Sequence, residues 1–137
     1  MQIVAFNEGR FIMAEDIKKE ELMNSEISLG FSTVLKYRKD NDVVGALLNV
    51  EYNTGEEQLL FYGVVVSVYL EGWSEFKAQN PSKDDIITKL TPMWDMVLGF
   101  VRGLLAEKTK NTTFDELFLP IINVTNMLES LQIEAVE

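Results

Sequence analysis

The residue types that carry most enzyme chemistry are missing from this chain of 137 residues. It contains neither histidine nor cysteine, which removes the Ser-His-Asp and Cys-His nucleophile systems, the commonest general base and the commonest transition-metal ligand. One spacing, Ser74-Glu-Phe-Lys77, matches the S-x-x-K element of serine acylating enzymes, in which the lysine assists the serine. Neither a K-T-G nor an S-D-N element accompanies it, so a solvated loop after a strand is the preferred interpretation. We expect no catalytic residue and no enzyme activity.

Two further polar patterns have simpler explanations than a functional site. Asp84 and Asp85 offer oxygen ligands for Mg²⁺ or Ca²⁺, but no D-x-D-x-D-G loop and no third acid at a useful offset accompany them. The beginning of a helix explains these acids better. Asn111-Thr-Thr113 and Asn123-Val-Thr125 match the glycosylation sequon, which has no meaning without a secretory signal. The sequence therefore predicts no metal and no other cofactor.

Composition and charge exclude two classes of partner. Twelve Lys and Arg against 22 Asp and Glu give a net charge of −10, whereas nucleic acid and anionic membrane surfaces select clustered cations. The N-terminal residues lack the basic and apolar regions of a signal peptide. The longest apolar runs, 59–70 and 96–106, are shorter than the roughly twenty residues of a membrane helix. We expect a single cytoplasmic domain, 1–137, with neither nucleic acid nor membrane as partner.

Three segments have the period of two that is typical of strands. Residues 27–38 and 44–52 alternate apolar and polar side chains, and the polar cluster 39–42 between them predicts a hairpin. Residues 58–70 are apolar on both faces and rich in β-branched and aromatic types, so we expect a strand that is covered on both faces. The N-terminal segment 1–25 allows a short strand or a helix, and 132–137 form an acidic tail.

The second half of the chain changes to the helical period. Ser82 is the expected N-cap of a short helix, and Thr91-Pro92 begins a second helix that continues to about Lys108. Two apolar stripes lie side by side on the second helix, and its remaining narrow face carries glycines four residues apart. Such glycines lower helix stability unless a close neighbour compensates, so we expect this helix to join copies of the chain. The predicted interface residues are Trp94, Leu98, Gly99, Arg102 and Gly103.

An excess of apolar residues surrounds the end of the third strand and a short helix predicted near the C-terminus. Most of these residues are expected to form the core. A minority would line an apolar groove that captures extended apolar segments, which suits a strongly acidic and hence soluble protein. The candidate groove residues are Tyr62, Tyr69, Trp73, Phe76, Met127 and Leu128.

The stretch from Phe114 to Val124 resembles the late motif F-P-x-L-x-L-x-P-[VI]-N-F of the SecB export-chaperone superfamily. The matching residues are Phe114, Leu117, Leu119, Pro120, Ile122 and Asn123, with the proline one position early. Arg102 lies where the family has the arginine of its long helix, and Glu71-Gly-Trp73 is similar to the family's A-G-[IVL]-F turn. Two departures are Val124 for the final phenylalanine and Leu98-Gly-Phe-Val-Arg102 for the F-P-Y-A-R run.

The resemblance implies an α+β fold, with an antiparallel four-stranded sheet, a long helix and a short C-terminal helix. It implies assembly into a dimer or tetramer through sheet edges and long helices, and a client groove between the sheet and the last helix. The implied function is that of an ATP-independent holdase or dedicated chaperone in protein transport, which binds extended apolar segments of unfolded or partly folded clients. The alternative is a non-catalytic structural or adaptor protein, phage-related in origin, with one folded partner. A small-molecule-binding or hydrolytic domain is a third hypothesis, with less support from the sequence.

Overall fold

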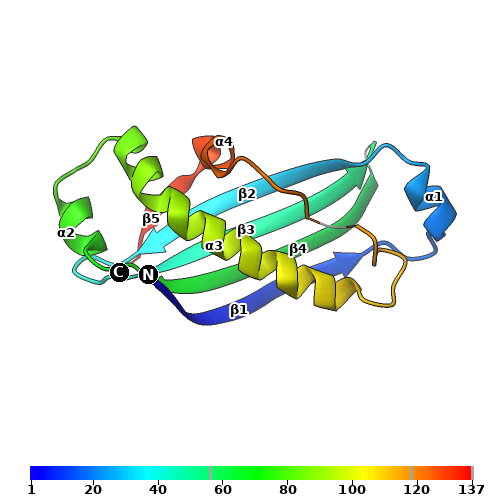
Figure 1. Cartoon of the computed structure of the whole chain (residues 1–137), viewed down its shortest axis with the longest axis horizontal. Helices are drawn as coiled ribbons and strands as arrows, with labels where there is room; N and C mark the ends of the chain where they lie inside the picture. The colour runs from blue at the N-terminus through cyan, green and yellow to red at the C-terminus, as the bar shows by residue number, and fades with distance from the viewer. Residues whose placement is uncertain (56, 118, 137) are drawn as a thin grey trace.

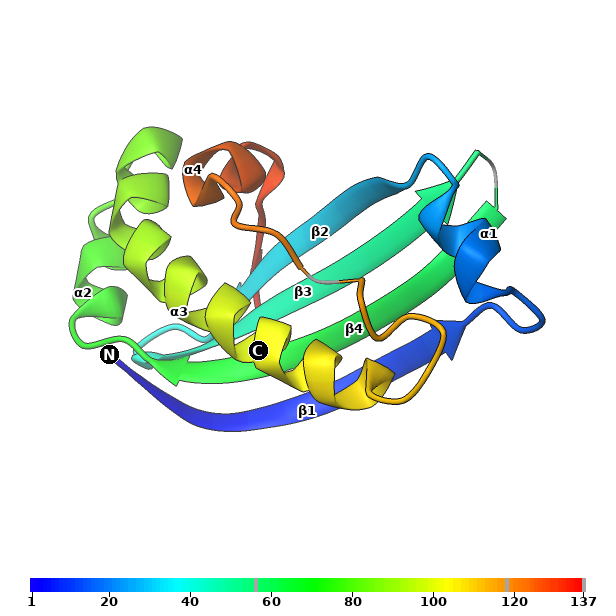
Figure 2. The same ribbon diagram turned by 45° about the vertical axis from the view of Figure 1, so that its right-hand side comes forward.

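The computed structural model describes residues 1–55, 57–117 and 119–136. A sheet forms one layer, and the longest helix crosses it diagonally in a second layer (Figures 1 and 2). The elements in chain order are β1 (Gln2–Met13), α1 (Lys19–Met23), β2 (Ser28–Tyr37), β3 (Val43–Thr54), β4 (Glu57–Tyr69), α2 (Trp73–Ala78), α3 (Lys83–Thr109), α4 (Val124–Met127), a 3₁₀ turn (Leu128–Ser130) and β5 (Gln132–Ala135).

The sheet has five strands in the order β1-β4-β3-β2-β5. Strands β1 to β4 pair antiparallel, whereas β5 pairs parallel with β2, so the sheet is mixed. The α+β class is therefore confirmed, but the expected four-stranded antiparallel sheet is wrong. The segment predicted as an acidic tail supplies the fifth strand: Leu35 lies opposite Ile133, and the Val136 amide donates to the Tyr37 carbonyl oxygen at 2.7 Å.

The N-terminal segment forms a strand of twelve residues, β1, much longer than the short strand that the sequence allowed. Its register against β4 shifts between Ile3 and Ala5 and again between Glu8 and Phe11. Each β-bulge adds one residue and so reverses which residues face the helix. The period of two is therefore broken twice, which explains why the sequence pattern did not reveal this strand.

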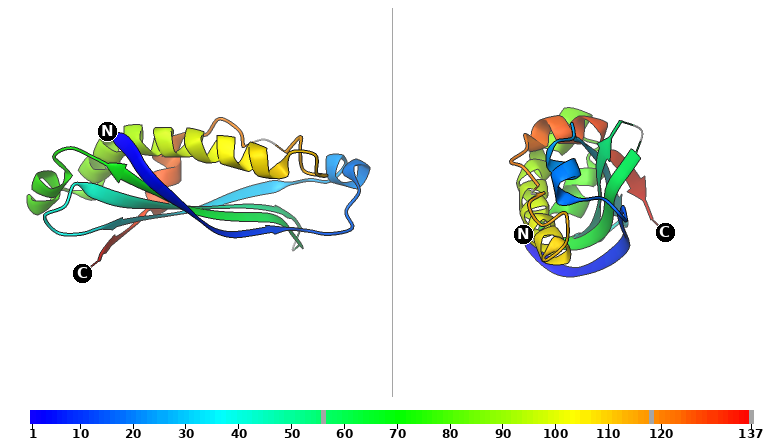
Figure 3. Two further views of the ribbon diagram at one scale, coloured as in Figure 1. Left: turned by 90° about the horizontal axis from the view of Figure 1, so that it is seen from below. Right: turned by 90° about the vertical axis from the view of Figure 1, so that its right-hand side faces the viewer.

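The three strands predicted from alternation are confirmed, but β4 is not covered on both faces. Its residues Leu60, Tyr62, Val64, Val66 and Val68 are buried beneath α3. On the opposite face Phe61 and Val65 are half-buried and Tyr69 is 40% exposed. The reason is that α3 and α4 lie on one face of the sheet, and the described part of the chain places no helix over the other (Figure 3).

A short helix, α2, replaces the solvated loop that was preferred for residues 74–77. Gly72 precedes it with a φ of 81°, a conformation that glycine adopts without strain. The Asp42 carboxylate accepts hydrogen bonds from the backbone N–H groups of Gly72 at 3.0 Å and Ser74 at 2.9 Å. A residue from the β2–β3 turn thus caps the helix. Because this residue is distant in sequence, the local pattern at 74–77 could not predict the cap.

The two helices predicted for residues 82–108 are one continuous helix, α3. Ser82 caps it as expected, because its hydroxyl accepts from the Asp85 N–H at 3.1 Å. Pro92 lies inside the helix and cannot donate to the Thr88 carbonyl, which normally ends or kinks a helix. Leu90 and Met93, on either side of it, are both fully buried against the sheet. Burial of a continuous apolar face outweighs the lost hydrogen bond.

The core lies between α3 and the helix-facing sides of β2, β3 and β4. Trp94, Val97 and Val101 of α3 are fully buried against it. The predicted short C-terminal helix is confirmed as α4 with its 3₁₀ turn, and Leu128 there is also fully buried. In the described ranges, no helix is long and apolar enough to cross a membrane.

Candidate functional site

The six candidate groove residues do not line one surface. Tyr62, Trp73 and Leu128 are fully buried and Met127 is nearly so, which leaves only Phe76 and Tyr69 accessible to a partner. Trp73 and Phe76 do lie together, with ring centroids 5.9 Å apart. Tyr69 is on the uncovered face of the sheet, away from them. The groove at these residues is therefore not formed, because the core takes up most of their side chains.

Four of the five predicted interface residues on α3 divide into two groups. Trp94 and Leu98 face the sheet and belong to the core of the same chain. Gly99 and Gly103 are exposed, and nothing beyond the helix backbone lies within 4 Å of where a Cβ atom would stand at either position. The outer face of α3 is therefore open for close approach by another backbone at these two glycines.

Arg102 holds the connection between α3 and α4. Its Nε donates to the Leu119 carbonyl oxygen at 2.9 Å, and its Nη2 donates to the Pro120 carbonyl oxygen at 3.0 Å. Phe114 and Leu119 of the same connection are buried in the core, and Asn123 caps α4 by accepting from the Asn126 N–H at 3.2 Å. These residues of the 114–124 stretch thus have structural contacts within the chain.

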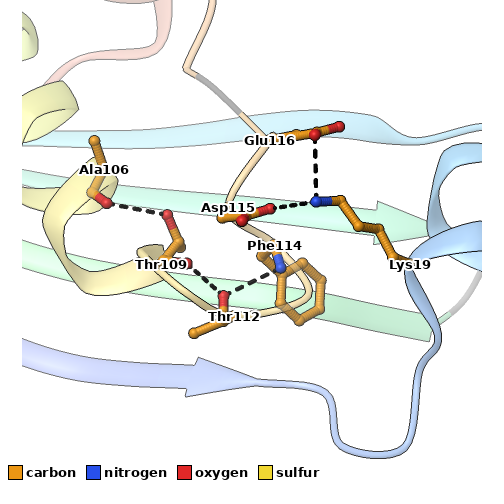
Figure 4. Close-up of polar contacts among 7 residues, drawn as sticks. All are labelled: Lys19, Ala106, Thr109, Thr112, Phe114, Asp115 and Glu116. Carbon is orange, nitrogen blue, oxygen red and sulfur yellow. Dashed lines mark hydrogen bonds and ion pairs between the residues drawn. The ribbon is translucent and has the colours of Figure 1, made fainter.

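Polar contacts at the start of this connection fix its path, as Figure 4 shows. The Thr112 hydroxyl donates to the Thr109 carbonyl at 2.6 Å and accepts from the Phe114 N–H at 3.1 Å. Lys19 of α1 lies 2.9 Å from an Asp115 carboxylate oxygen and 3.2 Å from one of Glu116. These contacts raise the pKa of Lys19, and they tie the connection to the N-terminal part of the chain.

An apolar surface that the sequence patterns missed lies along β1. This strand pairs with β4 on one side, and in the described part of the chain its other edge is unpaired. Phe6 remains 44% exposed although its ring meets Phe100 of α3 edge to face, with centroids 5.1 Å apart. We call the free edge of β1, with Val4, Phe6, Gly99, Phe100 and Gly103, the edge surface.

Side chains of β1 and β4 fasten β1 to the end of α3. Glu8 accepts from the Tyr62 hydroxyl at 2.9 Å and pairs with the Lys108 ammonium at 2.9 Å. The ammonium also lies 5.3 Å from the centroid of the Phe11 ring, within cation–π range. The hydrogen bonds from Lys108 and Tyr62 lower the pKa of Glu8, and burial with the Glu8 contact raises the pKa of Tyr62. The edge surface is therefore built on a fixed strand.

No known protein family, curated protein or solved structure matches this chain. Within residues 1–55, 57–117 and 119–136, no three acidic side chains come together as a group that could hold a metal ion.

Proposed function

We propose that the chain is a SecB-like, ATP-independent holdase that binds extended apolar segments of non-native protein. The edge surface carries this proposal, because it combines a long unpaired strand edge with apolar side chains on β1 and α3. An extended segment can add to such an edge through main-chain hydrogen bonds, while alternate side chains contact Phe6 and Phe100. The apolar motif at 114–124 supports the same class of function by resemblance.

The two bulges of β1 limit what can bind to this edge. Regular register is kept over Ala5–Glu8 and Phe11–Met13, and Arg10 lies between these stretches. Natural proteins use bulges and edge charges to prevent indiscriminate strand pairing. A bound segment is therefore short and held in part by its side chains, which fits reversible capture.

A second copy of the chain can use the same edge. Antiparallel pairing of two β1 strands about a two-fold axis would join the sheets, and the open faces at Gly99 and Gly103 would allow two α3 helices to approach. Because client and second copy then compete for one edge, we expect added client to dissociate the assembly.

The test is suppression of the aggregation of an unrelated denatured protein, at equimolar ratio and without nucleotide. Val4 and Val43 give a matched pair of variants, because both are exposed strand valines, at 49% and 38%, and only Val4 belongs to the edge surface. Full burial of an apolar side chain contributes roughly 1.5 to 3 kcal/mol. Val4 is 49% exposed and has about half of this contribution left to gain, so Val4→Lys should weaken client binding by up to about tenfold. Val43→Lys should leave it unchanged. Equal activity of both variants would refute the proposed site, and inactivity of the wild-type chain would refute the function.

A second candidate function is that of an adaptor with one folded partner. The observation in its favour is the uncovered face of the sheet, where Val43 and Tyr69 are exposed and Val65 is half-buried. Such a face is broad and fits a folded surface better than an extended chain. If Val43→Lys abolishes retention of a folded partner while Val4→Lys does not, the adaptor function is the correct one.

A further inference from the structure

A cavity of about 240 Å³ lies where the end of β2, α2 and β5 meet. Three cationic side chains line it, Arg38, Lys39 and Lys77, together with one acid, Asp40. We call it the basic pocket. The chain as a whole carries a charge of −10, so a pocket with an excess of two positive charges has the opposite sign to the net charge of the chain.

Arg38, Lys39 and Lys77 of the basic pocket make no ion pair with any residue that the structure describes. Among the described residues, the ion pairs within 4.0 Å are made by Lys19 and Lys108. Lys77 instead lies over the Tyr37 ring, with its ammonium 5.3 Å from the centroid. Grouped cations repel one another unless an anion joins them, so their charge is available for a ligand.

The walls between the cations are apolar. Tyr37, Ala78 and Ala135 line the pocket, and the Tyr37 ring packs edge to face against the buried Trp73, with centroids 6.0 Å apart. An inorganic anion would leave these walls without a partner. A ligand with both an apolar body and a charged end would use the walls and the cations together.

The pocket is held open by contacts between segments far apart in the sequence. Asp42 accepts from the N–H groups of Gly72 and Ser74, and these hydrogen bonds lower the pKa of its carboxyl group. They fix the β2–β3 turn, which carries Arg38 and Lys39, against α2, which carries Lys77. A preformed site loses little entropy on binding.

From this geometry we infer that the basic pocket binds an organic carboxylate, with its apolar body against Tyr37 and Ala78 and its charge at Arg38, Lys39 and Lys77. The planar guanidinium of Arg38 suits the two oxygens of a carboxylate. The same chemistry is present in a small organic acid and in the C-terminal residue of a peptide that ends in an apolar side chain. The inference does not depend on the proposed holdase function, because the basic pocket and the edge surface share no residue.

The test compares two ligands that both carry a phenyl group on a short alkyl chain but have opposite charges. The full chain, labelled with ¹⁵N, is titrated with 3-phenylpropionate and with 3-phenylpropylamine while amide shifts are recorded. We expect saturable shifts at residues 37–40 and 74–78 with the acid only. Arg38→Gln and Lys77→Gln should each weaken binding about tenfold, because each substitution removes one charge-assisted contact to the carboxylate. Lys110→Gln, at an exposed cation outside the pocket, is the control and should bind as the wild type does.

Two further titrations distinguish a peptide C-terminus from a small organic acid, and an organic carboxylate from an inorganic anion. A short peptide ending in phenylalanine is titrated as the free acid and as the amide. If the free-acid peptide binds more tightly than 3-phenylpropionate, the site is assigned to a peptide C-terminus. If the free-acid peptide binds more weakly than 3-phenylpropionate, the site is assigned to a small organic acid. Inorganic phosphate is titrated in parallel. Binding of the amine as tight as the acid, equal losses in Lys110→Gln and Arg38→Gln, or phosphate binding tighter than 3-phenylpropionate would each overturn the inference.

Discussion

Glu8 is the residue that connects the edge strand to the long helix. Its carboxylate accepts a hydrogen bond from the Tyr62 hydroxyl and forms an ion pair with the Lys108 ammonium. Both contacts favour the ionised form of Glu8 over the protonated form. The unfolded chain offers neither contact. The folded state is therefore stabilised by ionised Glu8, and this stabilisation depends on pH.

We predict that Glu8→Gln lowers the free energy of unfolding near neutral pH and has less effect in acid. The folded pKa of Glu8 lies below its ordinary value of 4.5, so the stabilisation is complete above pH 4.5 and is lost as the pH falls through the folded pKa. Urea unfolding of both proteins between pH 3 and pH 7 measures this. A difference between the two proteins that stays constant over the whole range would contradict the prediction.

At the scale of one element, α3 continues through Pro92, a residue that normally ends or kinks a helix. The helix lacks the hydrogen bond to the Thr88 carbonyl at this point, yet the buried residues Leu90 and Met93 keep both halves on the sheet. The proline side chain is exposed, so we expect little packing that would offset its effect on the backbone.

We predict that Pro92→Ala stabilises the chain. Proline costs about 3 kcal/mol relative to alanine inside a helix, whereas it also reduces the conformational entropy of the unfolded chain, which offsets roughly 0.4 to 1 kcal/mol of that cost, so we expect a gain of about 1 to 2 kcal/mol. Thermal and urea unfolding give the change, and Thr88→Ala, one turn away on an exposed position, serves as the control. A loss of stability in Pro92→Ala would show that the proline has a required contact.

The elements that were predicted correctly are those whose pattern is local and regular. Strands β2 to β4 lie where the sequence alternates or is rich in β-branched and aromatic residues. Ser82 caps α3 by accepting from the Asp85 N–H, as the sequence pattern predicts. In β1 the two bulges reverse the phase of the alternation. In β5 there are only four residues, and its place in the sheet depends on pairing with β2, which no local pattern contains.

The candidate site was harder to predict than the fold because burial is a property of the whole arrangement. The sequence shows that Trp73, Tyr62 and Leu128 are apolar or aromatic, but only the path of α3 and α4 decides that they lie inside. Conversely, Phe6 lies in the first half of β1, whose outer edge is unpaired in the described part of the chain, and its side chain stays 44% exposed. The one signal that could have drawn attention to β1 is its content of aromatic and β-branched residues, Ile3, Val4, Phe6, Phe11 and Ile12.

At the scale of the whole molecule, we predict that the chain assembles through the edge surface. Light scattering at micromolar concentration should show more than one chain per particle. Gly99→Leu should dissociate the assembly, because a leucine side chain would occupy the open space at the glycine, while the separated chain remains folded. Gly99→Ala is the control: it adds a single methyl group and should stabilise α3 by about 1 kcal/mol. A monomeric wild-type chain would refute this prediction.

The order of the strands has a consequence for how the chain folds. Only the meander β2-β3-β4 is built from neighbouring segments; both outer strands pair with residues distant in sequence, Phe6 with Val66 and Leu35 with Ile133. Loop closure makes such pairings slow to form. The meander with α3 is therefore the expected nucleus, and β1 and β5 attach after the rate-limiting step, so substitutions in these two strands should change the unfolding rate and leave the folding rate almost untouched.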